Sequence, residues 1–261
     1  MSAKKSDPNK PRGQRYIQSI IVGFRLIHAL QETGTKMSLK RLAQLAGMSP
    51  SNAHLYLVSF GKLGLIVQDP VTSFYGLGPY AIELGLEAVR QLDVADVARG
   101  RLEELSERLE QSVYLSVWAN KGPTIILKYD ARSGGFPLAI RIGYVLPLIS
   151  SATGQVFLAH LADREIAPIV EQEIADATKR SKRVAAIRRA VHRDGVGISD
   201  SRLYEGFGAV SAPIFDHENR IAAAITALGP SNSLNVSPTG ATAKIIKEAA
   251  AQISHALVGG R

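Results

Sequence analysis

The segment from Ser49 to about Gly64 carries side chains that suit contact with a nucleic acid. At 100° per residue, its apolar residues share one face, and most of the others point the opposite way. The core face holds Ala53, Tyr56, Leu57, Phe60 and Leu63, and the outward face holds Ser51, His54, Leu55, Val58 and Lys62, with Asn52 at its edge. The outward face has no carboxylate, so a phosphate-lined groove can approach it without repulsion. Short polar side chains would contact base edges, while Lys62 and backbone amides meet phosphates.

The elements around this segment predict a winged helix-turn-helix over residues 16–78. Apolar residues recur at helical spacing from Ile17 to Leu30, which predicts a first helix with one buried face. A second helix begins at a Ser38 cap and stops at Gly47, and Ser49 caps the third. Residues 65–68 and 73–77 then read as a β-hairpin around a turn.

The charge distribution agrees with a polyanionic partner. Residues 1–70 hold ten Lys or Arg and three acids, a net charge of +7, and the remaining 191 residues hold only +1. Neutralising phosphates releases counterions, so such a cationic end favours nucleic acid. A plain basic tail is the alternative, because residues 1–15 read as a flexible arm that includes Arg12.

Composition excludes several other classes of protein. A chain of 261 residues with 46% hydrophobic content can bury a core and suggests one or two domains. It has no cysteine, which excludes disulfides and thiolate chemistry and favours a reducing cytoplasm. No apolar run is long enough for a membrane span or a secretion signal. The six histidines never fall at metal-ligand spacing, so we expect no metal and no cofactor.

The rest of the chain predicts a linker helix at 79–95 and an α+β domain at 96–261. The helical pattern continues past the linker helix to about residue 112. Strands are then expected at 113–119, 123–128, 138–142, 207–215 and 221–228, and helices at 152–161, 181–193 and 238–257. Strands and helices interleaved around hairpins suggest one antiparallel sheet. The apolar stripe of the linker helix, which includes Ile82 and Leu86, is a candidate dimer seam, with burial inside one chain as the alternative.

Three further sequence patterns resemble functional motifs but have simpler structural explanations. Residues 76–81 match a dinucleotide fingerprint that ends in Ala, but a hairpin precedes them and the required βαβ unit is missing. Ser59 and Lys62 have the Ser-x-x-Lys spacing of some acyl-transfer enzymes, without the partner motifs. The basic run from Lys179 to Arg193 is either a solvated helix face or an additional contact with DNA or a partner protein.

Four segments, in this order, resemble the IclR family of bacterial transcriptional regulators. They are "SLKRLAQLAGMSPSNAHLYLVSFGKLGLI", "YGLGPYAIELG", "PLISSATGQVFLA" and "GFGAVSAPIFDHENRIAAAITALGP". The resemblance covers nearly all of the chain after residue 15. It implies a winged helix that binds double-stranded operator DNA and a C-terminal GAF-like domain that binds a small organic effector. It also implies a homodimer or a dimer of dimers, with no enzymatic activity.

This chain departs from the family at the DNA-contacting positions. The family usually has a basic residue where Leu55 stands and Thr where Asn52 stands. Ser51, Asn52 and His54 would then hydrogen-bond to base edges, and Leu55 would pack against a thymine methyl group. The expected wing tip, residues 69–73, lacks the usual basic residue, so minor-groove contact would fall to Arg12 and Arg15.

The resemblance also places the effector under the loop and helix start at residues 150–154. Amides at a helix start suit a carboxylate, and Ser151 and Thr153 add hydroxyl groups beside Ala152 and Gly154. The apolar wall would come from Phe136, Leu138 and Leu146, the opposite strand supplies Thr226 and Leu228, and the remaining positions are Ser199, Asp200 and Ala209. Apolar residues at 209 and 228 favour an acid with an aromatic or similarly apolar body.

Two other classes of function stay open from the sequence. An enzyme built on a GAF-like domain is one, although redox versions of that domain use cysteines, which this chain lacks. A sensor that binds a ligand but no longer binds DNA is the other, motivated by Leu55 and by the wing without a basic residue. Retardation of the protein's own upstream DNA in a gel separates these classes from a regulator.

Overall fold

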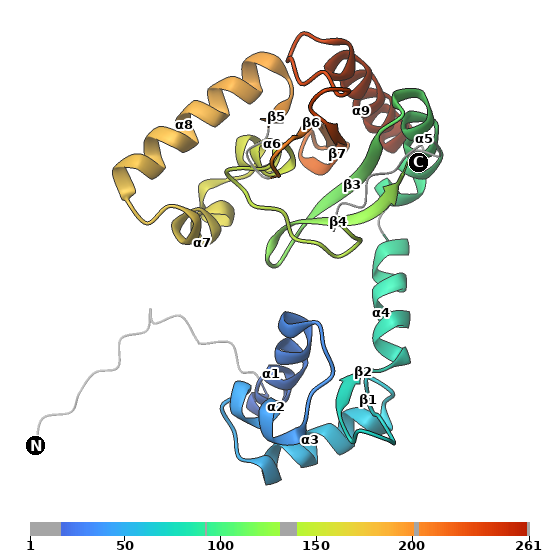
Figure 1. Cartoon of the computed structure of the whole chain (residues 1–261), viewed down its shortest axis with the longest axis vertical. Coiled ribbons are helices and arrows are strands. Elements are labelled where there is room, and N and C mark those ends of the chain that lie inside the picture. Colours follow the sequence, from blue (N-terminus) through green and yellow to red (C-terminus); the bar gives the residue numbers. More distant parts are fainter. Residues whose placement is uncertain (1–16, 92, 131–139, 201–203, 260–261) are drawn as a thin grey trace, which may run out of the picture. The chain divides into compact units, whose positions relative to one another are not determined.

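A computed structural model of the chain describes residues 17–91, 93–130, 140–200 and 204–259. Its contacts divide the chain into two compact units, which join between Ala88 and Val89. The elements, labelled in Figure 1, are α1 (Gln18–Thr33), α2 (Leu39–Leu45), α3 (Pro50–Lys62), β1 (Ile66–Gln68), β2 (Tyr75–Leu77), α4 (Pro79–Arg90), α5 (Asp93–Leu109), β3 (Ser112–Ala119), β4 (Gly122–Tyr129), α6 (Ala152–His160), α7 (Asp163–Glu173), α8 (Ala177–Asp194), β5 (Gly197–Asp200), β6 (Phe207–Phe215), β7 (Ile221–Pro230) and α9 (Ala241–Gly259).

In the first unit, three helices and a hairpin enclose one small core. Leu26, Leu42 and Leu57, one from each helix, are almost completely buried at its centre. The hairpin closes the core with Ile66 and Tyr75, and β1 and β2 pair antiparallel. Burial of one apolar face per helix is what holds helices of this length together. The predicted winged helix-turn-helix is therefore confirmed.

The buried face of α1 differs from the prediction. Leu26, Ala29 and Leu30 are buried, whereas Ile17, Ile20, Ile21 and Phe24 are exposed. The reason lies at Gly23, where a Cβ atom would come within 2.8 Å of the Tyr56 ring of α3. Close packing at Gly23 turns that side of α1 toward the core, so the neighbouring apolar stripe is left on the surface.

Two helix ends also differ from the predictions. Leu63 was expected in the core face of α3, but the helix ends at Lys62 and the Leu63 side chain is exposed. The helix expected over 79–95 ends at Arg90, and α5 begins at Asp93. Asp93 and Asp96 lie in the first turn of α5, where carboxylates favour a helix start.

The second unit is an α+β domain around one five-stranded antiparallel sheet. The strand order is β4-β3-β7-β6-β5, as Figure 1 shows. Helices α5 and α9 bury one face of the sheet with Val113, Val210 and Ile225, and α6 covers the other face. The predicted fold class, a winged helix-turn-helix followed by an α+β domain, is confirmed. No helix in the described ranges is long and apolar enough to cross a membrane.

The strand expected at 138–142 was wrong for its described part. Residues 140–142 belong to no strand, and 138 and 139 lie outside the described residues. Contact with the sheet comes a little later in the chain, where Val145 bridges to Thr124 and the Gly143 amide donates to the Ile125 carbonyl. Gly143 has φ +85°, and this left-handed turn replaces a regular strand.

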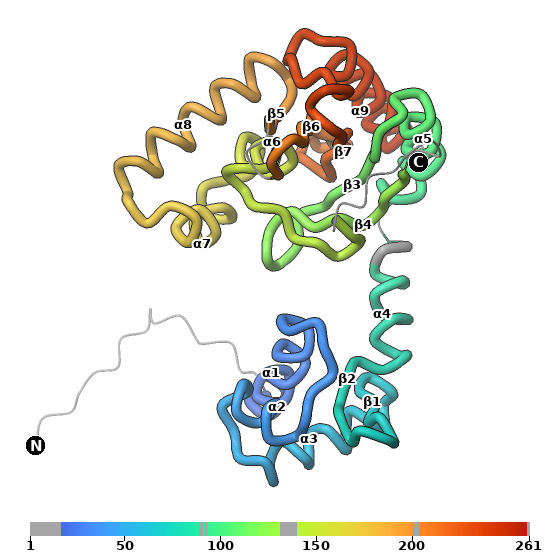
Figure 2. The backbone as a smooth tube through the Cα atoms, in the orientation of Figure 1, coloured from blue at the N-terminus to red at the C-terminus, as the bar shows by residue number. Residues whose placement is uncertain are grey.

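Two elements were missing from the sequence prediction, α7 and the edge strand β5. Figure 2 follows the chain from α6 through α7 and α8 to β5. Pro168 lies inside α7, which weakens its helical signal. Strand β5 is only four residues long, and its pairing with β6 stabilises it.

Candidate nucleic-acid interface and effector cavity

The start of α3 is fixed by local hydrogen bonds. Ser49 Oγ accepts from the Asn52 amide at 3.3 Å, and Pro50 occupies the first helical position. Ser38 Oγ caps α2 in the same way, accepting from the Arg41 amide at 3.4 Å. Between the two helices, Gly47 adopts φ +64°, which permits the tight turn. Ser38 and Ser49 therefore serve as helix caps and lie beside amides that stay available to phosphate.

The outward face of α3 is as exposed as the sequence predicts. Ser51, Asn52, His54, Leu55 and Lys62 are all exposed, and Leu55 exposes 67% of its surface. Ala53 and Leu57, on the opposite side, are buried. A helix of thirteen residues with no acid and one free face is a suitable element for a DNA groove.

The wing is organised by Asp69. One of its carboxylate oxygens accepts from the Val71 and Thr72 amides at 3.1 and 3.0 Å, and the other accepts from Lys36 Nζ at 2.9 Å. These bonds, with the one from Lys36 as the largest cause, hold the pKa of the carboxyl well below its usual range. Arg12 and Arg15, predicted to assist the wing, lie outside the described residues.

Five of the predicted effector residues lie around one small cavity in the second unit. These are Ser151, Ala152, Ser199, Ala209 and Leu228. The cavity also has walls that the sequence prediction missed, formed by Tyr114, Ile140, Tyr204, Phe207 and Gly208. Its volume is about 10 Å³, which is about the room that one water molecule needs.

The other predicted effector residues lie elsewhere. Leu146 is buried in the cluster that packs beside the cavity, and the Asp200 carboxylate is exposed and accepts from Ser231 Oγ at 3.3 Å. Thr153 and Thr226 are fully buried and hydrogen-bonded to each other at 2.8 Å. Phe136 and Leu138 lie outside the described residues.

The start of α6 is partly occupied by its own cap. Ser151 Oγ accepts from the Gly154 amide at 2.8 Å, and the Gln155 amide donates to the Ser151 carbonyl. Gly154 is needed for close packing, because a Cβ there would clash with the Pro147 carbonyl. Of the four amides at this helix start, those of Ala152 and Thr153 make no hydrogen bond within the described residues.

The missed residue Tyr114 could be recognised only from the sheet pairing. Tyr114 lies on β3 opposite Thr226 of β7, and the Tyr114 hydroxyl lies 3.3 Å from Thr153 Oγ1. Burial raises the pKa of Tyr114 to about 12. In the sequence, Tyr114 is simply an aromatic residue in an apolar strand, because the partner strand follows more than a hundred residues later.

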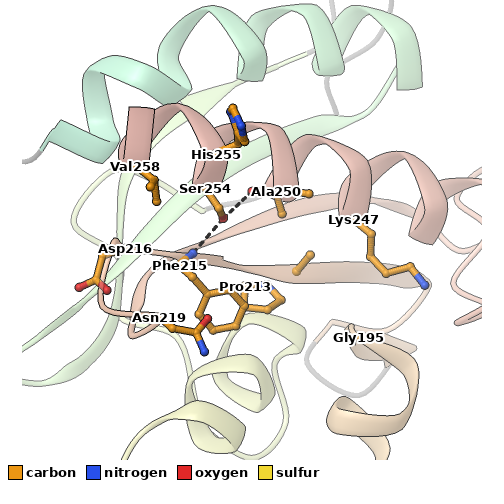
Figure 3. A pocket seen from close by; sticks show the side chains of 12 residues that line it. Gly195, Pro213, Phe215, Asp216, Asn219, Lys247, Ala250, Ser254, His255 and Val258 are labelled. Atoms are coloured by element: carbon orange, nitrogen blue, oxygen red, sulfur yellow. Dashed lines mark hydrogen bonds between the residues drawn. The ribbon is translucent and has the colours of Figure 1, made fainter. Parts of the chain in front are cut away.

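Two larger grooves in this unit contain none of the predicted effector residues. One, of about 550 Å³, runs along α9 past Lys247, Ser254 and Val258 (Figure 3). Ser254 Oγ in it is satisfied, since it accepts from the Phe215 amide and donates to the Ala250 carbonyl. The other, of about 400 Å³, lies between α7 and α8, where Arg188 pairs with Asp163 at 2.7 Å. No group of three or more metal-ligating side chains occurs in the described part of the chain.

Comparison with known proteins places both units in one family. The description "IclR helix-turn-helix domain" matches residues 19–70, and "Bacterial transcriptional regulator IclR C-terminal" matches residues 86–255. The HTH-type transcriptional regulator XynR of Escherichia coli (strain K12) is 27% identical over 215 residues, which cover 80% of this chain and 85% of XynR.

Solved structures agree with these matches. Pseudomonas aeruginosa HmgR is 34% identical to this chain, with a TM-score of 0.59, and the match covers 93% of this chain and 98% of HmgR. An IclR homologue from Microbacterium hydrocarbonoxydans, complexed with 4-hydroxybenzoate, has a TM-score of 0.73. That match covers 91% and 98% of the two chains, and at 19% identity it shows a shared fold.

Proposed function

Because the chain belongs to the IclR family of bacterial transcriptional regulators, we propose that its winged helix binds operator DNA and that a small organic acid controls this binding. The acid binds in the cavity at the start of α6. The family membership makes the chain a DNA-binding regulator of transcription. The residues that contact the operator and the class of effector are our proposal.

The proposed DNA contact is supported mainly by the outward face of α3, which is exposed and contains no acidic residue. In our proposal Ser51, Asn52 and His54 contact base edges, and Leu55 packs against a thymine methyl group. Lys62 and the free amides beside Ser38 and Ser49 hold phosphates and so fix the register on the duplex.

The cavity supports an acid with an apolar body. Its walls from Ile140, Phe207 and Leu228 suit a ring or an alkyl group, and the helix start at Ala152, which lines the cavity and has a free amide, suits a carboxylate. A strongly polar effector would leave oxygens without partners against these apolar walls, at a cost of about 1 to 3 kcal/mol each. An aromatic acid needs more volume than the present 10 Å³, so binding requires the walls to move apart.

One protein of the same fold illustrates this class of ligand. The Microbacterium hydrocarbonoxydans homologue was crystallised with 4-hydroxybenzoate, an aromatic monocarboxylate. Our proposal for this chain rests on its own cavity walls and helix start, and the shared fold supports it.

We also propose a homodimer, or a dimer of dimers, that uses the apolar side chains of α4. Ile82, Leu84 and Leu86 are all exposed, and none of the α4 side chains that the structure describes is buried. The described part of the predicted stripe thus stays on the surface of the first unit, which supports its use as a seam between copies. Two winged helices on a two-fold axis also read a longer operator than one can.

Two experiments test the proposed function. In a gel-retardation assay, the protein should retard DNA from its own upstream region and release it as the salt concentration rises. A thermal-shift screen of carboxylic acids should then identify stabilising ligands with one carboxylate and an aromatic or alkyl body. Stabilisation by sugars, amines or nucleotides alone rejects the acid, and DNA that is not retarded rejects the regulator.

A further inference from the structure

Four buried hydroxyl groups form a chain that starts at the effector cavity. The Tyr114 hydroxyl lies 3.3 Å from Thr153 Oγ1, which lies 2.8 Å from Thr226 Oγ1. Thr226 Oγ1 donates to Ser211 Oγ at 2.8 Å, and Ser211 Oγ donates to the Ile225 carbonyl at 3.3 Å. All four side chains are at most 2% exposed, so water does not replace these bonds.

The number of available protons determines in which direction the hydrogen bonds of these four hydroxyl groups are donated. Each hydroxyl has one proton to donate, and the Ile225 carbonyl can only accept. Because Ser211 donates to Ile225 and Thr226 donates to Ser211, Thr153 must donate to Thr226. The Tyr114 proton is then the one that bonds to Thr153. The opposite direction makes one hydrogen bond fewer and leaves the buried Tyr114 proton without an acceptor in the chain.

The other hydroxyl groups of the cavity wall also donate their protons to protein atoms. Ser151 Oγ donates to the Pro147 carbonyl, and Ser199 Oγ donates to the Ser150 carbonyl at 2.9 Å. Tyr204 donates its proton to the Tyr144 oxygen at 3.0 Å. The described side chains of the cavity wall therefore offer hydrogen-bond acceptors rather than donors to a ligand.

We infer that Tyr114 selects the effector by accepting a hydrogen bond, so that the acid carries a hydroxyl group in addition to its carboxylate. This inference rests on the proposed function, because it concerns the ligand of the same cavity. The carboxylate takes the free amides at the start of α6, and the hydroxyl of the ligand donates to the Tyr114 oxygen. Tyr114 keeps its own proton because burial raises its pKa to about 12.

Ser211 determines this selection without touching the ligand. Ser211 does not line the cavity. It nevertheless determines the direction of hydrogen-bond donation among the four hydroxyl groups, because it accepts from Thr226. In Ser211→Ala, the Thr226 proton has no such acceptor and turns to Thr153. The Thr153 proton then turns to Tyr114, and Tyr114 becomes a donor toward the cavity. Ser211 is thus a positioning residue for the specificity of Tyr114.

Calorimetric titration with matched acids tests the inference. The ligands are benzoate and its hydroxy and fluoro derivatives at each ring position, because fluorine is close to a hydroxyl in size but donates nothing. The wild-type protein should bind one hydroxybenzoate at least about tenfold more tightly than the matching fluorobenzoate. Tyr114→Phe should reduce this ratio to near one, and Ser211→Ala should reduce it as far or invert it.

Ser116→Ala is the matched control, because Ser116 Oγ is also buried but has no hydrogen-bond partner in the described structure. It should keep the wild-type ratio, and thermal melting checks that all three variants fold. A wild-type ratio near one, or a ratio unchanged in Ser211→Ala or Tyr114→Phe, overturns the inference while leaving an acid effector in place. If no benzoate binds, the proposed aromatic acid is rejected and this inference falls with it.

Discussion

Lys36 Nζ lies 2.9 Å from Asp69 Oδ2, so the segment between α1 and α2 is joined to the turn of the wing. The stem of Lys36 passes over Gly76 of β2, where a Cβ atom would lie 2.9 Å from Lys36 Cγ. Asp69 also accepts from two amides of its own turn. The wing is thus shaped by its turn and tethered to the helices by a cation that sequence reasoning had counted only as charge.

Replacing Asp69 separates these two contributions. Asp69→Asn keeps an oxygen for the Val71 and Thr72 amides and loses only the exposed ion pair, which contributes little to stability. We expect its DNA affinity to stay close to that of the wild type. Asp69→Ala also loses the turn, so its affinity for upstream DNA should fall several-fold in fluorescence anisotropy. Equal affinities of the two variants would show that the turn does not position the wing for DNA.

Substitutions on α3 should distinguish phosphate contacts from base contacts. Lys62→Gln should weaken binding to all sequences alike and reduce the slope of log K against log salt by about 0.9. Asn52→Ala should cost about 1 to 3 kcal/mol on the operator and relax the preference at one base position. Lys244→Gln, an exposed cation of the second unit, is the control that should leave both properties unchanged. Anisotropy over a salt series, with operator and scrambled DNA, measures the differences.

Much of the fold could be predicted because the residues that start, end and orient its elements lie close to them in the sequence. The caps at Ser38 and Ser49, the turn at Gly47 and the outward face of α3 depend on neighbours only a few residues away. The buried side of α1 could not be predicted in this way, because two apolar stripes compete and the Gly23 contact with Tyr56 decides between them. That contact joins residues from two different helices.

The effector cavity was predicted only in part for the same reason. Ser151 and Ala152 belong to one segment and could be recognised together, and Ser199 was recognised as polar, although it lies in strand β5 rather than in the expected loop. The direction of hydrogen bonding from Tyr114 depends on Thr153, Thr226 and Ser211, which come from α6, β7 and β6. Those residues meet only through strand pairing and the packing of α6 on the sheet. Thr153 and Thr226 consequently act beneath the cavity, where sequence reasoning had expected direct ligand contacts.

The exposed stripe of α4 predicts the oligomeric state. Introducing glutamate at Ile82 and Leu86 together places two charges in the proposed seam, and the protein should sediment as a monomer. The control is Ile142→Glu, which changes an equally exposed residue of the second unit and should leave the mass unchanged. A double variant with the mass of the wild type would move the interface to another surface.

Acid should destabilise the second unit through His160. Its ring packs against His192 and Phe215, with both centroid distances at 5.1 Å. Burial, followed by the charge of His192, lowers the pKa of His160 from 6.5 to about 4. Between these values the unfolded chain binds a proton that the folded chain does not, so stability falls as the pH drops from about 6.5 toward 4.

Partial exposure of His160 limits this loss to about 1 to 2 kcal/mol. His160→Asn should therefore reduce the difference in Tm between about pH 7.5 and about pH 5 by roughly 3 °C. His217→Asn changes an exposed histidine and should keep the wild-type difference. If His160→Asn keeps it as well, another group causes the sensitivity to acid.

The coupling between acid and DNA tests the central claim most directly. The affinity for labelled upstream DNA is measured by anisotropy with and without a saturating acid from the thermal-shift screen. We expect the acid to change this affinity at least fivefold, at the lower end of typical coupling energies, and DNA to change the affinity for the acid by the same factor. Ala209→Phe, which fills the cavity, should retain DNA binding and lose the response. A DNA affinity that stays the same while the acid is bound would contradict the account.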